Sequence, residues 1–311
     1  MPLVPEIRRL LESAAALGLP PMHEQLPAAA REIYRRTTAL DPRSTARLAE
    51  VRDTACDGPA TAIPLRVYTP AGPAPFPVLI YFHGGGFVIG DLDTHDNVCR
   101  ELCAGAGCVV VAVDYRLAPE HRFPAAVDDC EAATRWVMAH GPALQANARI
   151  AVGGDSAGAN LATVVARRLR DAGGPCPCAQ MLVYPVTGHY SHETPSLRDN
   201  ATGYGLTRAA MAWYTDHYVE NRADISDPDA APLCAESLTG LPPAWVATCE
   251  YDPLRDEGEA YGQRLVAAGV TTTMKRYAGT IHGIFKSPTA LKSGRRMVDD
   301  ACAWLRQQFG S

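Results

Sequence analysis

The sequence predicts an α/β fold, in which helices cover both faces of a mainly parallel sheet. Short apolar runs rich in Val and Ile alternate with longer helical patterns, and this alternation is typical of parallel strands joined by crossover helices. The apolar runs predict strands at Leu65–Thr69, Val78–Phe82, Val109–Val113, Arg149–Gly153, Gln180–Tyr184, Ala244–Thr248 and Thr272–Tyr277. The helical patterns cover Asn97–Ala106, Pro124–His140, Ala157–Ala172, Glu257–Ala268 and Gly294–Phe309.

Composition excludes several other classes of protein. The 311 residues include 29 basic and 34 acidic side chains, a net charge of −5 without a run of either sign, so nucleic acid is not an expected partner. No apolar stretch is long enough to span a membrane, and the N-terminus lacks the apolar core of a secretion signal. The 10 cysteines are scattered without paired CxxC motifs. We therefore expect a cytoplasmic protein with reduced thiols, no metal site and no membrane contact.

Two stretches interrupt the alternation of strands and helices. The N-terminal stretch is helical without a strand, and Thr187 to Leu233 holds a helix over Thr207–Val219 where a short crossover would suffice. Open α/β sheets bind their ligands at the carboxyl ends of the strands, so we predict that both stretches form a helical cap there. The expected division is an N-terminal cap segment (1–45), a first part of the core (46–186), a cap insertion (187–233) and a second part of the core (234–311).

A serine motif follows the strand Arg149–Gly153. Residues 154–158 read Gly-Asp-Ser-Ala-Gly and lead directly into a helix. When a G-x-S-x-G motif lies between a strand and a helix, the serine is held on a sharp turn. Side chains at the two glycine positions of such a turn would clash with their neighbours. The alternative is a turn of small residues without a catalytic role. The flanking strand and helix favour Ser156 as a nucleophile.

A serine hydroxyl is a weak nucleophile and needs a base, which in turn needs a carboxylate. Among the histidines after Ser156, His282 is the one that directly follows a strand, so it is the predicted base. The loop after Ala244–Thr248 offers several carboxylates, and Asp252 is the predicted acid because it lies within the loop itself. Glu250 is the alternative acid.

The next two carboxylates in this loop have a simpler interpretation. Asp256 and Glu257 suit the first turn of the following helix, where negative charge is favourable.

A glycine run predicts the donors for a tetrahedral oxyanion. The strand Val78–Phe82 ends in His-Gly-Gly-Gly at residues 83–86, where bare backbone can approach a substrate. We predict an oxyanion hole formed by the amides of Gly84, Gly85 and Ala157. The spacing of the run does not match a dinucleotide-binding motif, which argues against a nucleotide.

Four motifs together resemble the hormone-sensitive-lipase family of bacterial esterases, in its GDSAG branch. They are HGGG at 83–86, GDSAG at 154–158, DPLRDE at 252–257 and HG at 282–283, and residues 114–129 are also similar to a connecting segment of that family. The resemblance implies an α/β-hydrolase fold with a helical cap, and hydrolysis of a small-molecule carboxylic ester without a cofactor. It leaves a homodimer through the last strand and the terminal helix open, and it does not define a role for Asp155, whose side chain could brace nearby loops.

The expected activity is a serine carboxylesterase for short- to medium-chain acyl esters. An amidase or lactonase with the same residues is an alternative, and a non-catalytic receptor is another, as in the plant gibberellin receptors that resemble this family but lack the full triad. Candidate residues of the substrate pocket are Phe87, Tyr204, Trp213 and Tyr214. For Trp213, a core position on its helix is the competing interpretation.

Overall fold

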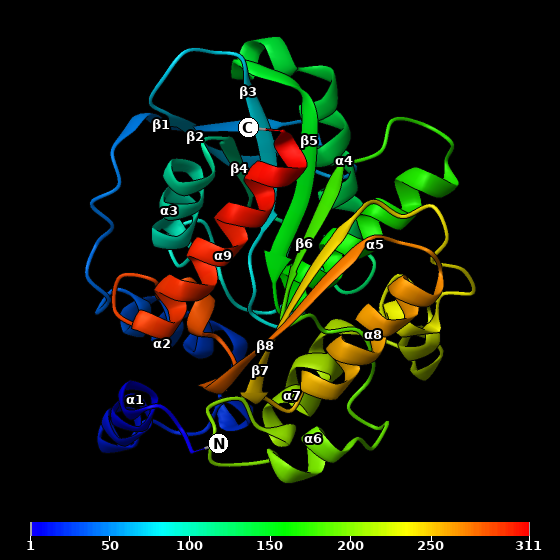
Figure 1. Ribbon diagram of the computed structural model, residues 1–311. Helices are drawn as coiled ribbons and strands as arrows, with labels where there is room; N and C mark the ends of the chain where they lie inside the picture. Colours follow the sequence, from blue (N-terminus) through cyan, green and yellow to red (C-terminus); the bar gives the residue numbers. More distant parts are fainter. Residues whose placement is uncertain (1, 311) are drawn as a thin grey trace.

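The computed structural model describes residues 2–310, without the side chains of residues 222 and 223. Within this range, strands form one sheet in the order β1-β2-β4-β3-β5-β6-β7-β8 (Figure 1). β1 and β2 are antiparallel to their neighbours, and the pairs from β4 to β8 are parallel. The strands are β1 Leu48–Cys56, β2 Ile63–Pro70, β3 Phe76–Phe82, β4 Val109–Val113, β5 Ala146–Asp155, β6 Ala179–Val183, β7 Ala244–Tyr251 and β8 Thr272–Ile281.

The α-helices are α1 Pro5–Ala16, α2 Pro27–Thr38, α3 Asp96–Ala106, α4 Ala125–Ala139, α5 Ala157–Asp171, α6 Pro195–Asp199, α7 Arg208–Tyr218, α8 Arg255–Ala267 and α9 Lys292–Phe309. Short 3₁₀ helices are η1 Met22–Glu24, η2 Gly141–Leu144, η3 Arg222–Ser226, η4 Pro232–Cys234 and η5 Ile284–Lys286.

β1 has no counterpart among the predicted strands. It lies at the edge of the sheet, pairs only with β2 and buries only its last residue, Cys56, so its polar and charged positions give no apolar run. The predicted strands are all present, and most of them bury a continuous or alternating set of apolar side chains. The exception is β8, which buries only Tyr277 within the predicted range Thr272–Tyr277.

Each face of the sheet has its own hydrophobic core. Val78 and Ile80 of β3 pack with residues of α4, α5 and α8, whereas Leu79 and Tyr81 pack on the opposite face with residues of α3 and α9. Figure 1 shows α3 and α9 across the near face of the sheet. This two-faced burial explains why the central strands are apolar at successive positions instead of alternate ones.

Four helices lie at the carboxyl end of the strands: α1, α2, α6 and α7, here called the cap helices. Figure 1 shows them at the lower end, toward which the arrowheads of β5, β7 and β8 point. The predicted helix over Thr207–Val219 corresponds to α7. Thr207 caps the N-terminus of this helix, because its side chain accepts a hydrogen bond from Ala210 N at 3.1 Å.

Arg31 of α2 binds the two loops that contain Val88 and Ala118. Its guanidinium donates to the carbonyl oxygens of Val88 and Ala118, each at 2.8 Å, and pairs with Glu120 at 2.6 Å. Val88 belongs to the loop that follows the glycine run, so the position of this cap helix is coupled to that loop.

Two features are absent from the described residues. No helix in the range 2–310 is long and apolar enough to cross a membrane. Nor do His, Cys, Asp and Glu side chains of this range gather into a group that could hold a metal ion.

Candidate active site

Ser156 lies on a strained turn between β5 and α5. Its backbone has φ 57° and ψ −119°, and its amide donates to Val183 O at 2.8 Å. A Cβ atom at Gly154 would lie 2.3 Å from Phe82 O, and one at Gly158 would lie 1.8 Å from the same atom. Both glycines are therefore required, because the turn packs directly against the end of β3.

Ser156, His282 and Asp252 form a continuous line of hydrogen bonds. His282 Nε2 lies 3.0 Å from Ser156 Oγ, and His282 Nδ1 lies 2.7 Å from Asp252 Oδ2. The Asp252 side chain is fully buried, and its other oxygen accepts a hydrogen bond from Leu254 N at 2.9 Å. This carboxylate can therefore hold the imidazole with Nε2 directed at the serine.

The alternative acid, Glu250, bonds elsewhere. Its Oε2 accepts a hydrogen bond from Gly279 N at 2.6 Å. Glu250 lies within β7, whereas Asp252 lies just past the end of this strand, which is the position that the loop argument favours.

The glycine run requires one correction. Gly84 N donates to Asp155 Oδ1 at 3.0 Å, so the prediction that the Gly84 amide serves an oxyanion is wrong. Gly85 and Gly86 line the cavity beside Ser156, with φ 126° and 59°. Among the described residues, none accepts a hydrogen bond from the amides of Gly85, Gly86 or Ala157.

Asp155 connects the glycine run to the serine turn. It accepts hydrogen bonds from the Tyr81 hydroxyl at 2.6 Å and from Gly84 N, and His95 Nε2 lies 3.4 Å from its Oδ1. Burial alone would raise the pKa of Asp155, but His95 and the Tyr81 hydroxyl outweigh burial and lower it to about 2. Asp155 is thus a buried carboxylate that fixes the beginning of the glycine run.

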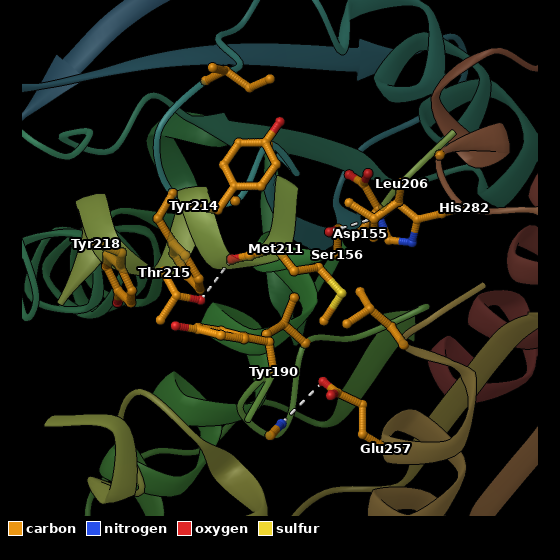
Figure 2. Close-up of a pocket in the computed structure, with 18 of the residues that line it drawn as sticks. Asp155, Ser156, Tyr190, Leu206, Met211, Tyr214, Thr215, Tyr218, Glu257 and His282 are labelled. Atoms are coloured by element: carbon orange, nitrogen blue, oxygen red, sulfur yellow. Dashed lines mark hydrogen bonds between the residues drawn. The ribbon is translucent and has the colours of Figure 1, made fainter. Parts of the chain in front are cut away.

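A cavity of about 170 Å³ opens beside Ser156 and His282 (Figure 2). Of the predicted pocket residues, Phe87 and Tyr214 line it. Tyr204 and Trp213 do not: the Tyr204 ring packs against Tyr251 at 4.8 Å, and Trp213 is 9% exposed within the core. The side of α7 that faces the cavity carries Met211, Tyr214, Thr215 and Tyr218.

Sequence reasoning missed much of the cavity wall. α2 contributes Tyr34, and α7 contributes Met211, Thr215 and Tyr218. Loops and other elements contribute Ile89, Val186, Gly188, Tyr190, Leu206, Leu254, Glu257, Gly283 and Lys286. Cap helices and loops that are distant in sequence build this wall, so no local sequence pattern marks its residues. The expectation that both cap segments cover the site does indicate which segments contribute to the wall.

Glu257 is a buried acid in this wall. Its Oε1 accepts hydrogen bonds from Thr187 N at 2.8 Å and Gly188 N at 3.1 Å, as Figure 2 shows for one of them. Burial raises the pKa of Glu257 to about 7, although these two amides oppose the shift. The side chain therefore does more than complement the N-terminus of α8.

A family model described as the α/β hydrolase fold matches residues 79–286. The esterase LipI of Mycobacterium tuberculosis is 49% identical over 239 residues, which cover 75% of this chain and 74% of LipI. The chain belongs to the hormone-sensitive-lipase family of α/β hydrolases. The ethyl acetate hydrolase of Pseudomonas putida is 36% identical over 289 residues, 89% of each chain. A serine-to-alanine variant of LAE6, an α/β hydrolase from the Lake Arreo metagenome, is 44% identical, with a TM-score of 0.95 over 99% of each chain.

Proposed function

We propose that this member of the hormone-sensitive-lipase family is a carboxylesterase that hydrolyses short- to medium-chain acyl esters through a Ser156–His282–Asp252 triad and an acyl-enzyme. The observation that carries the proposal is the 3.0 Å approach of His282 Nε2 to Ser156 Oγ beside a cavity. Relatives named as esterases support the ester as the bond that is cleaved.

In the first half of the reaction, Ser156 Oγ attacks the acyl carbon while His282 Nε2 takes the hydroxyl proton. Asp252 stabilises the imidazolium that results. The carbonyl oxygen becomes an oxyanion, for which the amides of Gly85, Gly86 and Ala157 are the proposed donors. The bond to the alcohol oxygen then breaks as His282 returns the proton to it, and the alcohol leaves.

In the second half, a water molecule replaces the alcohol. His282 takes a proton from water, and the hydroxide oxygen attacks the acyl carbon of the Ser156 ester. The new tetrahedral intermediate collapses when His282 returns the proton to Ser156 Oγ, which releases the carboxylic acid. Each half uses the same base and the same amides, so no cofactor is needed.

The size of the cavity supports small substrates. At about 170 Å³ it falls below the roughly 300–1,000 Å³ that is usual for sites of drug-sized ligands. Its wall is largely apolar, with Phe87, Leu206 and Met211 among its members. A short acyl chain would gain from burial there, and a long one would exceed the space.

Steady-state hydrolysis of p-nitrophenyl acetate tests the proposal. Ser156→Ala should reduce kcat by at least about 10³-fold, because the nucleophile is removed with almost no change in packing. The exposed Ser237 offers a matched control, and Ser237→Ala should retain wild-type kcat. Substantial turnover by folded Ser156→Ala would show that another group carries the reaction.

A further inference from the structure

Lys286 lines the cavity that holds Ser156, and its side chain ends in a primary amine. It ends η5, four positions after His282 in the chain, and it lines the cavity together with His282 and Gly283. Its Nζ donates to Thr38 Oγ1 at 3.2 Å and lies 5.0 Å from the centre of the Tyr34 ring. Both partners belong to α2, so the amine sits where a cap helix meets the loop of the predicted base.

The contacts of this amine with the described residues do not include a counterion. A hydroxyl and an aromatic ring attract an ammonium group, but neither carries a negative charge. Among the side chains described, no carboxylate forms an ion pair with Lys286; Asp41 and Asp155 act on it only at longer range. Burial lowers the pKa of Lys286, as expected for an ammonium group that has lost water without gaining an anion.

The position of His282 indicates which part of an ester meets Lys286. This inference rests on the proposed esterase reaction, in which His282 Nε2 must return a proton to the leaving alcohol oxygen. The alcohol part therefore departs on the side of His282, and Gly283 and Lys286, which follow His282 in the chain, also line the cavity. An anionic group elsewhere in the cavity would meet the carboxyl groups of Glu257 and Asp155 and an otherwise largely apolar wall.

We infer that the cavity selects esters whose alcohol part carries a carboxylate, and that Lys286 binds this carboxylate. The corresponding substrates are short acyl esters of hydroxycarboxylic acids. Hydrolysis would release a short carboxylic acid and a hydroxy acid, with Lys286 contributing to substrate selection and not to the reacting atoms.

A pair of substrates that differ only in charge tests this inference. 4-Acetoxybutanoate carries a carboxylate on the alcohol part, and 4-acetoxybutanamide is its neutral isostere. Wild-type protein should show a higher kcat/KM for the carboxylate. In Lys286→Met the ratio of the two values should fall about tenfold or more, the scale for a hydrogen bond to a charged group.

Two further variants separate the charge of Lys286 from its volume and from net charge. Lys286→Arg keeps a cation and should retain most of the preference. Lys292→Met removes the same charge from an exposed position at the start of α9 and should leave the ratio unchanged.

The monoethyl ester of glutaric acid and its amide form a second pair, with the charge on the acyl part, and should show no comparable preference.

Several outcomes would overturn the inference. They are a wild-type ratio at or below one, an unchanged ratio in Lys286→Met, or a charge preference confined to the acyl pair. The wild-type ratio is informative even where Lys286→Met fails to fold. Failure of the proposed function is distinguishable, since wild-type protein would then not hydrolyse p-nitrophenyl acetate either.

Discussion

The amide of Gly84 donates a hydrogen bond to Asp155 Oδ1 at 3.0 Å, which ties the glycine run to the residue directly before Ser156. The two loops that take part in the proposed acyl transfer thus share one buried carboxylate. Gly85 and Gly86 follow immediately, so the direction of their amides depends on where this bond holds Gly84. Asp155 is in this account a positioning residue for the oxyanion hole.

Removal of this bond should reduce turnover. In Asp155→Ala, Gly84 N and the Tyr81 hydroxyl both lose their acceptor, and we expect kcat to fall by about 10²-fold, the scale for one misplaced oxyanion donor. Asp155→Asn keeps an acceptor oxygen and should lose less. KM should change only a few-fold in both, since Asp155 does not provide the apolar wall. Steady-state kinetics with p-nitrophenyl butyrate measure both constants, and a wild-type kcat in folded Asp155→Ala would contradict the account.

Asp155 should also contribute to acid denaturation. Its pKa is lowered from 3.8 to about 2, so its contribution to folding is present above pH 4 and is lost as the pH falls toward 2. The lost free energy of unfolding is on the order of 2 kcal/mol. Urea unfolding at pH 6 and pH 3 should show a smaller loss on acidification in Asp155→Asn than in wild type. Equal losses in the two proteins would show that Asp155 is not held ionised by its partners.

The two candidate acids can be separated by amide substitutions. Asp252→Asn should lower kcat by on the order of 10⁴, because the amide no longer stabilises the imidazolium and favours the wrong tautomer of His282. Glu250→Gln is the matched control, two positions earlier at the end of β7, and should stay within a few-fold of wild type. The reverse pattern, measured with the same ester, would assign the acid to Glu250.

Glu257 should make the protein less stable as the pH rises toward neutrality. Its pKa is raised from 4.5 to about 7, so the folded state binds a proton that the unfolded chain has already released in this range. The resulting loss of unfolding free energy between pH 4.5 and pH 7 is on the order of 3 kcal/mol. Glu257→Gln should remove this loss, as urea unfolding at the two pH values can measure. A wild-type slope in that variant would mean that Glu257 titrates normally.

Acyl chain length should have an upper limit. Each buried CH₂ contributes about 0.8 kcal/mol, so kcat/KM should rise along the series until the cavity is full. We expect a maximum at roughly four to eight carbons and a fall of at least about tenfold by sixteen, since further methylenes meet protein or water. Rates for p-nitrophenyl esters, measured below and above each solubility limit, test this. A maximum at long chains, or activation at the ester–water interface, would instead indicate a lipase.

An element of this fold can be predicted from the sequence when neighbouring residues in the chain determine it. Strands such as Val109–Val113 are predictable because every side chain in them is buried. The serine turn is equally local, since the packing of Gly154 and Gly158 demands glycine. β1 was not predictable in the same way, because an edge strand that buries one residue leaves a polar pattern.

The cavity wall shows the limit of local reasoning. Glu257 satisfies the helix-start interpretation, yet its carboxyl binds the loop at Thr187, 70 positions away in the chain. Lys286 meets Thr38 across 248 positions. Gly84 and Gly86 are indistinguishable in the motif, and only the bond to Asp155 decides which of their amides is occupied. Such contacts arise from tertiary packing and leave no period or spacing in the sequence.

The proposed reaction requires that Ser156 carry the acyl group between its two halves. Acid quenching of the protein within milliseconds of mixing with p-nitrophenyl hexanoate, followed by peptide mass spectrometry, tests it most directly. We expect one hexanoyl group per chain on the peptide that contains Ser156, a burst of p-nitrophenol of matching size, and neither in Ser156→Ala. Steady turnover with the acyl group on a different peptide, or an undiminished burst in Ser156→Ala, would contradict it.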